Sequence, residues 1–247
     1  MTHLITFVLD ETGSMQSRKE VTISGFNEWM QEMEKFPGEV LLNLIKFNSD
    51  KHELLIKQAV LGLTKPRLTK ESYLPAALTP LLDAVGRAIR ETDSQLENLP
   101  EDTDVVLVIL TDGQENASTE FSLEAIKALI AEKEKAGWAI TYMGASADAW
   151  MGAQTMGVSV GATMNFMGDN QSSQQAFLSN AIAVSRYMGG GSSAGGIYSE
   201  AGVTDEHGQL ITKDVFDLTG TKDVFDLTGS PTVESDEDDD ENDLSEN

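Results

Sequence analysis

The sequence contains no cysteine and few basic residues. Without cysteine the chain can form no disulfide, no thiolate zinc site and no cysteine nucleophile, which fits a reducing compartment such as the cytoplasm. Lysine and arginine number 17 against 41 acidic residues, so the formal net charge is −24. Binding to nucleic acid requires clustered basic residues that neutralise phosphates, and we therefore expect no nucleic-acid partner.

Histidine is scarce, and long apolar runs are missing. His3, His52 and His207 lie far apart without HxH or HExxH spacing, so neither a histidine metal site nor a histidine general base is predicted. The apolar run at residues 4–9 has no basic flank and is far too short to span a bilayer. It predicts a buried strand, and we expect no membrane partner and no export signal.

What the chain does contain is an alternation of two patterns. Four short apolar runs are typical of strands covered on both faces: His3–Asp10, Val40–Phe47, Asp104–Thr111 and Trp138–Met143. Longer stretches with helical spacing lie between them: Glu20–Phe36, Pro80–Thr92 and Ser122–Ala136. Ser122 is a plausible N-cap and Gly137 a plausible helix stop. This alternation predicts an α/β fold with a mostly parallel central sheet and helices on both faces.

Two further features complete the predicted domain, which we expect over residues 1–188. The segment His52–Ile56 reads as an antiparallel edge strand that follows a polar hairpin at residues 48–51. After Met143 we expect a helical segment at 147–156, a short strand near 158–166 and a last helix at about 171–187. A length of 247 residues with 40% hydrophobic content suits one such domain with appendages.

The C-terminal part has a different composition. Residues 189–211 read as a linker and extension, because they begin with GGGSSAGG, a stretch of high backbone freedom with nothing to bury. Residues 212–229 are two exact copies of TKDVFDLTG, and residues 230–247 form an acidic tail for which we expect disorder. From Glu234 to the end there are nine acidic residues and no basic one, so without them the net charge falls in magnitude from −24 to −15.

Several features allow two interpretations. The repeat places apolar residues between acids, the pattern of a short docking peptide, but it is equally explained as a recent duplication without a role. Methionines at 143, 151, 156, 164 and 167 suit core packing or an adaptable contact surface. Glu11 and Glu115 read as exposed carboxylates that either enrich a negative rim or have no function.

Oxygen-bearing side chains gather in three separated stretches. Asp10-Glu-Thr12-Gly-Ser14 follows the first strand, Thr79 precedes a helix, and Asp112 follows the strand that ends at Thr111. Loops at the carboxyl ends of neighbouring parallel strands converge on one crevice, so these groups can meet there. Hydroxyls and carboxylates without histidine or cysteine are the ligands of a hard cation, so magnesium is the natural candidate, with manganese or calcium as alternatives.

These residues also resemble a known family. Asp10-Glu-Thr-Gly-Ser14 resembles the DxSxS motif of the von Willebrand factor A (vWA) family, Thr79 its loop threonine, and Ile109-Leu-Thr-Asp112-Gly its third motif. The chain departs from the family at Thr12, where serine is usual. Residues 112–118 and 137–145 are similar to the stand-alone vWA proteins of bacteria and their phages.

The resemblance implies a Rossmann-like α/β fold, a metal-ion-dependent adhesion site (MIDAS) formed by Asp10, Thr12, Ser14, Thr79 and Asp112, and a partner carboxylate that completes the coordination. We therefore expect a protein-binding module with an Asp or Glu on its partner, in the cytoplasm of a bacterium or of a phage-infected host, or associated with a virion. No oligomeric state is predicted, and we do not expect an enzyme.

Three alternatives stay open. A structural or assembly component would act through the repeat and the acidic tail. A phosphoester hydrolase using the same cation would need a base and basic residues that the sequence does not supply. Finally, Asp10, Thr12 and Ser14 would serve only as caps of the first helix.

Overall fold

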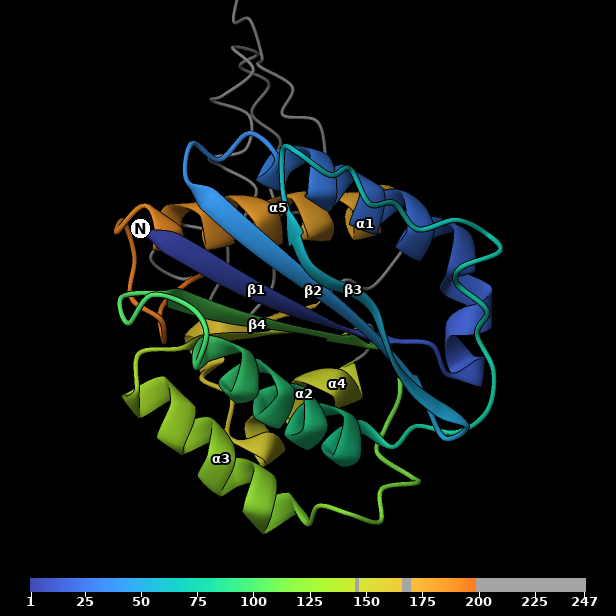
Figure 1. Ribbon diagram of the computed structural model, residues 1–247. Coiled ribbons are helices and arrows are strands. Elements are labelled where there is room, and N and C mark those ends of the chain that lie inside the picture. Colours follow the sequence, from blue (N-terminus) through green and yellow to red (C-terminus); the bar gives the residue numbers. More distant parts are fainter. Residues whose placement is uncertain (145–146, 166–169, 199–247) are drawn as a thin grey trace, which may run out of the picture.

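A computed structural model describes residues 1–144, 147–165 and 170–198, and its centre is a six-stranded sheet with the order β3-β2-β1-β4-β5-β6 (Figure 1). The strands are β1 Thr2–Asp10, β2 Glu39–Asn48, β3 Lys51–Val60, β4 Asp104–Thr111, β5 Ala139–Gly144 and β6 Thr163–Asn165. Only the β2–β3 pair is antiparallel. The predicted fold class is confirmed, including its antiparallel edge; the repeat and the tail lie outside the described residues.

The helices cover both faces of this sheet. They are α1 Lys19–Met33, α2 Leu81–Leu96, α3 Leu123–Lys135, α4 Ala147–Met156 and α5 Asn170–Met188. In Figure 1, α1 and α5 pack together on one face, and α2, α3 and α4 lie on the other. β1 is buried along its whole length between β2 and β4, which explains why its sequence is almost continuously apolar.

The ends of α3 follow the predicted local chemistry. The hydroxyl of Ser122 accepts a hydrogen bond from the backbone N–H of Ala125, as an N-cap does. After the helix, Gly137 adopts a φ of +95°, and the next N–H, of Trp138, donates back to the carbonyl of Lys133. Glycine adopts this left-handed conformation at little cost, so the helix ends there.

The edge strand β3 is twice as long as the predicted segment 52–56. Its pairing with β2 is irregular between Leu42 and Ile45. Near this irregularity Gln58 has a φ of 45°, and its N–H donates to the side-chain oxygen of Asn43 at 2.9 Å. Such a bulge interrupts the alternation of apolar and polar residues, so the second half of the strand carries no regular sequence pattern.

The core continues past the expected domain end at residue 188. Ile197 and Tyr198 are fully buried, and the N–H of Tyr198 donates to the carbonyl of Gly161 at 2.9 Å. The Tyr198 hydroxyl also contacts the Asn180 amide, which accepts a hydrogen bond from the Trp29 indole at 2.7 Å. The glycine-rich stretch therefore leads back into the core, and linker composition alone does not mark the end of the packing.

None of the helices in the described ranges is both long and apolar enough to cross a membrane.

The contact between α1 and α5 depends on a glycine. A Cβ added at Gly25 would overlap the buried ring of Phe177, whereas one at Gly152 in α4 would meet only the Tyr142 hydroxyl, at an ordinary 3.5 Å. We predict that Gly25→Ala lowers the free energy of unfolding by about 1–3 kcal/mol through overpacking. Gly152→Ala, the matched control, should be neutral or stabilising by up to about 1 kcal/mol. Urea denaturation of both variants tests this, and equal stabilities would contradict it.

Both described histidines lie on strands. Burial lowers the pKa of His3, and Asp104, whose carboxylate is 3.1 Å from the ring, partly offsets this. Burial also lowers the pKa of His52; the charge of Arg87 lowers it further and that of Glu120 raises it. A histidine whose pKa is lower in the folded protein resists protonation there, so its contribution to stability is present above its ordinary pKa and is lost as pH falls.

For His52 this gives a pH prediction. Between about pH 7.5 and 5.5 the wild-type chain should lose more stability than His52→Gln, because protonation favours the unfolded wild-type chain. Denaturation curves at several pH values measure the difference. If the two proteins lose the same stability over this interval, burial of His52 does not control its titration.

Candidate metal site

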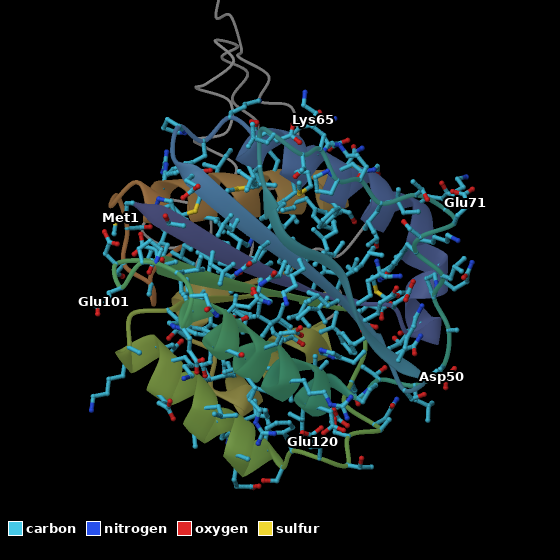
Figure 2. All side chains as sticks on the ribbon, viewed as in Figure 1. Met1, Asp50, Lys65, Glu71, Glu101 and Glu120 are labelled. Carbon is cyan, nitrogen blue, oxygen red and sulfur yellow. The ribbon has the colours of Figure 1, made fainter. Side chains whose placement is uncertain are left out.

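The candidate site lies where β1 and β4 end and α2 begins. β1 ends at Asp10 and β4 at Thr111, and these two strands are parallel neighbours. In Figure 2, Asp50 and Glu120 lie towards this end of the sheet, and Met1 and Glu101 lie towards the other. The carboxyl ends of the central strands therefore face a rim formed by the loops that follow them, as predicted.

Asp10 is fully buried at the centre of this site. One carboxylate oxygen accepts the backbone N–H of Thr12 at 2.7 Å, and the other accepts the Thr111 hydroxyl at 2.5 Å. Burial raises the pKa of Asp10 to about 6, although the hydrogen bonds from Thr111 and Thr12 oppose the shift. Since both oxygens already accept hydrogen bonds, the role that fits Asp10 is contact with a cation through water.

The neighbouring hydroxyls form a chain of contacts that leads to the second carboxylate. The Thr12 and Ser14 hydroxyls are 3.1 Å apart, and Ser14 donates to Asp112 at 2.5 Å. Burial raises the pKa of Asp112, and the Ser14 hydrogen bond and the Arg18 charge partly offset the shift. Thr12 keeps the hydroxyl that the usual serine would supply, and it is buried beside Ser14.

Thr79 reaches the same place from the loop before α2. A Cβ on Gly113 would lie 3.0 Å from the Thr79 hydroxyl and 3.5 Å from that of Ser14, so Gly113 keeps the space between them open. Asn116 fixes Thr79 from both sides: its side-chain oxygen accepts the Thr79 N–H at 2.8 Å, and its own N–H donates to the Thr79 carbonyl at 3.1 Å. All five predicted residues are thus brought together.

The capping alternative is wrong. A 3₁₀ helix, Gly13–Arg18, separates these residues from α1. The N-cap position of that turn is Thr12 and that of α1 is Arg18, and neither makes a side-chain capping hydrogen bond. Instead, Asp10 accepts hydrogen bonds from the Thr12 N–H and from the Thr111 hydroxyl of β4. The Thr12 and Ser14 hydroxyls lie beside each other, and Ser14 donates to Asp112 after β4.

Glu11 is not the exposed rim carboxylate that its position in the motif suggested. It is fully buried, 3.1 Å from the Lys46 ammonium and 2.8 Å from that of Lys51, and it accepts the Leu74 N–H at 2.5 Å. Buried charges are retained in this way when they are paired and hydrogen-bonded. Glu11 therefore ties the first motif to β2, to β3 and to the loop before Thr79.

Glu115 also organises loops. Its carboxylate accepts the backbone N–H groups of Leu82, Ala117 and Ser118 at 2.7–2.9 Å and the Ser118 hydroxyl at 2.6 Å. The Leu82 N–H belongs to the first turn of α2, where it has no partner within the helix. Glu115 thus joins the loop after Asp112 to the start of the helix that follows Thr79.

Arg18 was not predicted as part of the site. Its guanidinium nitrogen Nε lies 3.6 Å from Asp112, which places a positive charge beside the candidate ligands. The signal available in the sequence was weak, because Arg18 lies outside the DxSxS-like motif and on a turn that was not predicted. Arg18 therefore gives the site a positive side chain of its own beside Asp112.

The donor set fits a hard cation. Three hydroxyls and two carboxylates meet, all of them oxygen donors of the kind that magnesium, manganese and calcium accept. In residues 1–144, 147–165 and 170–198 no group of three or more His, Cys, Asp or Glu side chains forms a conventional metal cluster. The candidate site has only two carboxylates and therefore depends on its hydroxyls.

The hydrogen bonds of Glu115 generate a stability prediction. Glu115→Ala should lower the free energy of unfolding by about 2–4 kcal/mol, because it leaves three partly buried N–H groups without an acceptor. Glu120 lies in the same loop, and its carboxylate pairs with Arg87 and Arg90 at the surface. Glu120→Ala, the control, should lower the free energy of unfolding by less than about 1 kcal/mol. Equal losses in thermal or urea denaturation would show that Glu115 does not hold the loop.

No protein-family profile matches this chain, and no curated protein matches its sequence. Solved structures do resemble it. The PilB minor pilin from Streptococcus sanguinis has a TM-score of 0.58 at 13% identity, over 76% of this chain and 62% of that one. The pilus adhesin SpaC from Lactobacillus rhamnosus GG has a TM-score of 0.51 at 13% identity, over 74% of this chain and 30% of that one.

A third structure, the manganese-loaded TRAP protein from Plasmodium vivax, has a TM-score of 0.50 at 12% identity, over 73% of both chains. This chain thus spans less than two thirds of both pilus proteins and a larger share of TRAP. At such identities the likeness concerns the fold alone. Together with the strand order, it supports the predicted α/β fold with a mostly parallel central sheet.

Proposed function

We propose that Asp10, Thr12, Ser14, Thr79 and Asp112 hold a divalent cation, magnesium first, and that this site binds a carboxylate of a protein partner. The observation that carries the proposal is the meeting of three hydroxyls and two carboxylates from three loops. Ser14 and Thr79 supply neutral oxygens next to Asp112. Asp10 holds the loop of the first motif through its hydrogen bonds with Thr12 and Thr111. In the bound state the cation would supply positive charge at the rim.

The charge balance of the site favours an anionic partner. Asp10 accepts two protein hydrogen bonds, and Asp112 lies beside Arg18, so the two carboxylates neutralise a divalent ion only in part. The remaining attraction is available for a further carboxylate. Away from the site the acidic surface repels such a group within the Debye length of about 8 Å at physiological salt. Cation binding would thus make the site selective for a carboxylate.

Binding is better supported than hydrolysis. Among the described residues His3 pairs with Asp104 at the N-terminal ends of β1 and β4, away from the site. His52 lies on the edge strand β3, two strands from Asp10 on β1. The similar structures include a minor pilin, a pilus adhesin and the manganese-loaded TRAP protein. The likeness to these proteins favours a binding module with a cation. The cytoplasmic location stays a prediction.

Cation binding is tested by calorimetric titration with magnesium and manganese. Thr79→Val keeps the shape of the side chain and removes its hydroxyl, and Asp112→Asn removes a charge; each should weaken cation affinity at least about tenfold. Thr119→Val, in the same loop region but outside the set, is the matched control and should bind as the wild type does. Equal affinity in Thr79→Val and the control would refute the proposed ligand set.

Partner binding is tested with acetate and with a short acidic peptide. Both should bind the magnesium-loaded protein and lose their affinity when a chelator removes the ion. A deletion of the repeat and tail distinguishes the assembly alternative, since a partner that binds through these segments would no longer be retained. Undiminished binding of the peptide in chelator would contradict the metal-dependent mechanism.

A further inference from the structure

A second feature lies directly beside the candidate metal site. It is a cavity of about 330 Å³ between the start of α2, the loop after β4, and α4. Its walls are mainly apolar and include Leu81, Leu82, Gly113, Tyr142, Met151 and Met156. Met151 is 65% exposed at this cavity, whereas Met143, Met156 and Met164 are buried in the core. Of the four methionines of this set that the structure describes, Met151 is therefore the one that fits a contact surface; Met167 lies outside the described residues.

The cavity and the site share their walls. Gly113 lines the cavity and also lies against the Thr79 and Ser14 hydroxyls. Leu81 follows Thr79 after one residue, and Gln114 follows Asp112 after one residue, and both line the cavity. A peptide whose carboxylate binds at the metal site would therefore place a side chain one or two residues away in this cavity, and an apolar side chain would fit there.

A ligand of this chemistry exists within the chain. In the repeat, Asp214-Val-Phe216 and its copy Asp223-Val-Phe225 each place a carboxylate two residues before an aromatic ring. In an extended peptide residues i and i+2 project from the same face, about 6.6 Å apart. Asp217 and Asp226 would project from the opposite face. Each copy thus combines an acid and an apolar anchor with the spacing that the site and the cavity require.

We propose that the repeat is a ligand of its own domain: Asp214 or Asp223 binds at the cation site, and Phe216 or Phe225 fills the neighbouring cavity. The inference rests on the proposed cation site and names the partner carboxylate. Because two identical copies compete for one site, either can occupy it. The repeat then blocks the site, and an external acidic partner has to displace it.

The chain is long enough for this contact. The described part ends at Tyr198, whose N–H is bonded to Gly161, next to the short strand β6. Residues 199–213 can extend over about 50 Å, whereas a nine-residue strand such as β1 is only about 30 Å long. The repeat can therefore reach the carboxyl ends of the strands from any position along the sheet.

Tethering also offsets repulsion. Each copy carries two aspartates and one lysine and would approach an acidic domain. A ligand in the same chain has an effective concentration in the millimolar range when its linker spans the distance. This compensates for a weak individual contact, and free peptide should bind more weakly than the tethered repeat.

Paramagnetic broadening by manganese tests the contact in the full chain. With methyl groups of Met, Val and Leu labelled for NMR, Mn²⁺ should broaden the Met151 signal together with those of Val215, Val224, Leu218 and Leu227, and Mg²⁺ should not. In Asp214→Asn/Asp223→Asn, broadening of the repeat signals should fall to the level seen with Mg²⁺, while Met151 stays broadened. Asp217→Asn/Asp226→Asn has the same charge change on the opposite face and should behave as the wild type.

The outcomes separate the two proposals. If Mn²⁺ broadens Met151 but leaves the repeat signals sharp in the wild type, the cation site stands and the docking of the repeat is refuted. If Met151 is not broadened, the cation site itself is refuted, and the inference fails with it. If the repeat signals remain broadened in Thr79→Val, the acidic tail holds the ion, which also overturns the docking.

Discussion

The buried carboxylate of Asp10 is the constraint on which the rest of the site depends. It lies at the end of the central strand, where it joins the backbone of the first motif to the Thr111 hydroxyl on β4. A charge in this place is costly unless it is hydrogen-bonded, and burial accordingly raises the pKa of Asp10 to about 6. Its hydrogen bonds fix the loop that presents Thr12 and Ser14 to Asp112.

Around this centre, the site is held by carboxylates that are not candidate ligands. Glu11 connects the first motif to β2 and β3 through Lys46 and Lys51, and Glu115 connects the loop after Asp112 to the start of α2. Through these ion pairs and hydrogen bonds, Glu11 and Glu115 fix the loops that carry the oxygens of the site. A site built in this way requires little reorganisation on binding, which favours affinity for a small ion or a single carboxylate.

Most of the fold was predictable because apolar runs and helical spacing follow directly from burial. β1, β2, β4 and β5 were located closely, and Ser122 and Gly137 correctly marked the ends of α3. The five oxygen-bearing residues were found because strand ends converge. Burial of Glu11, the position of Arg18 beside Asp112 and the bulge near Gln58 depend on contacts between distant segments, which no local pattern encodes. For the same reason the return of Tyr198 to the core was not predicted.

The proposed cation site places one divalent ion among the hydroxyls of Thr12, Ser14 and Thr79 and the carboxylate of Asp112. A crystal structure of the full chain grown with manganese, recorded with anomalous diffraction, tests it most directly. We expect one strong anomalous peak between these side chains, with Asp10 in contact through water, and loss of that peak in Thr79→Val. An empty site in crystals whose manganese is bound only by the acidic tail would contradict this cation site.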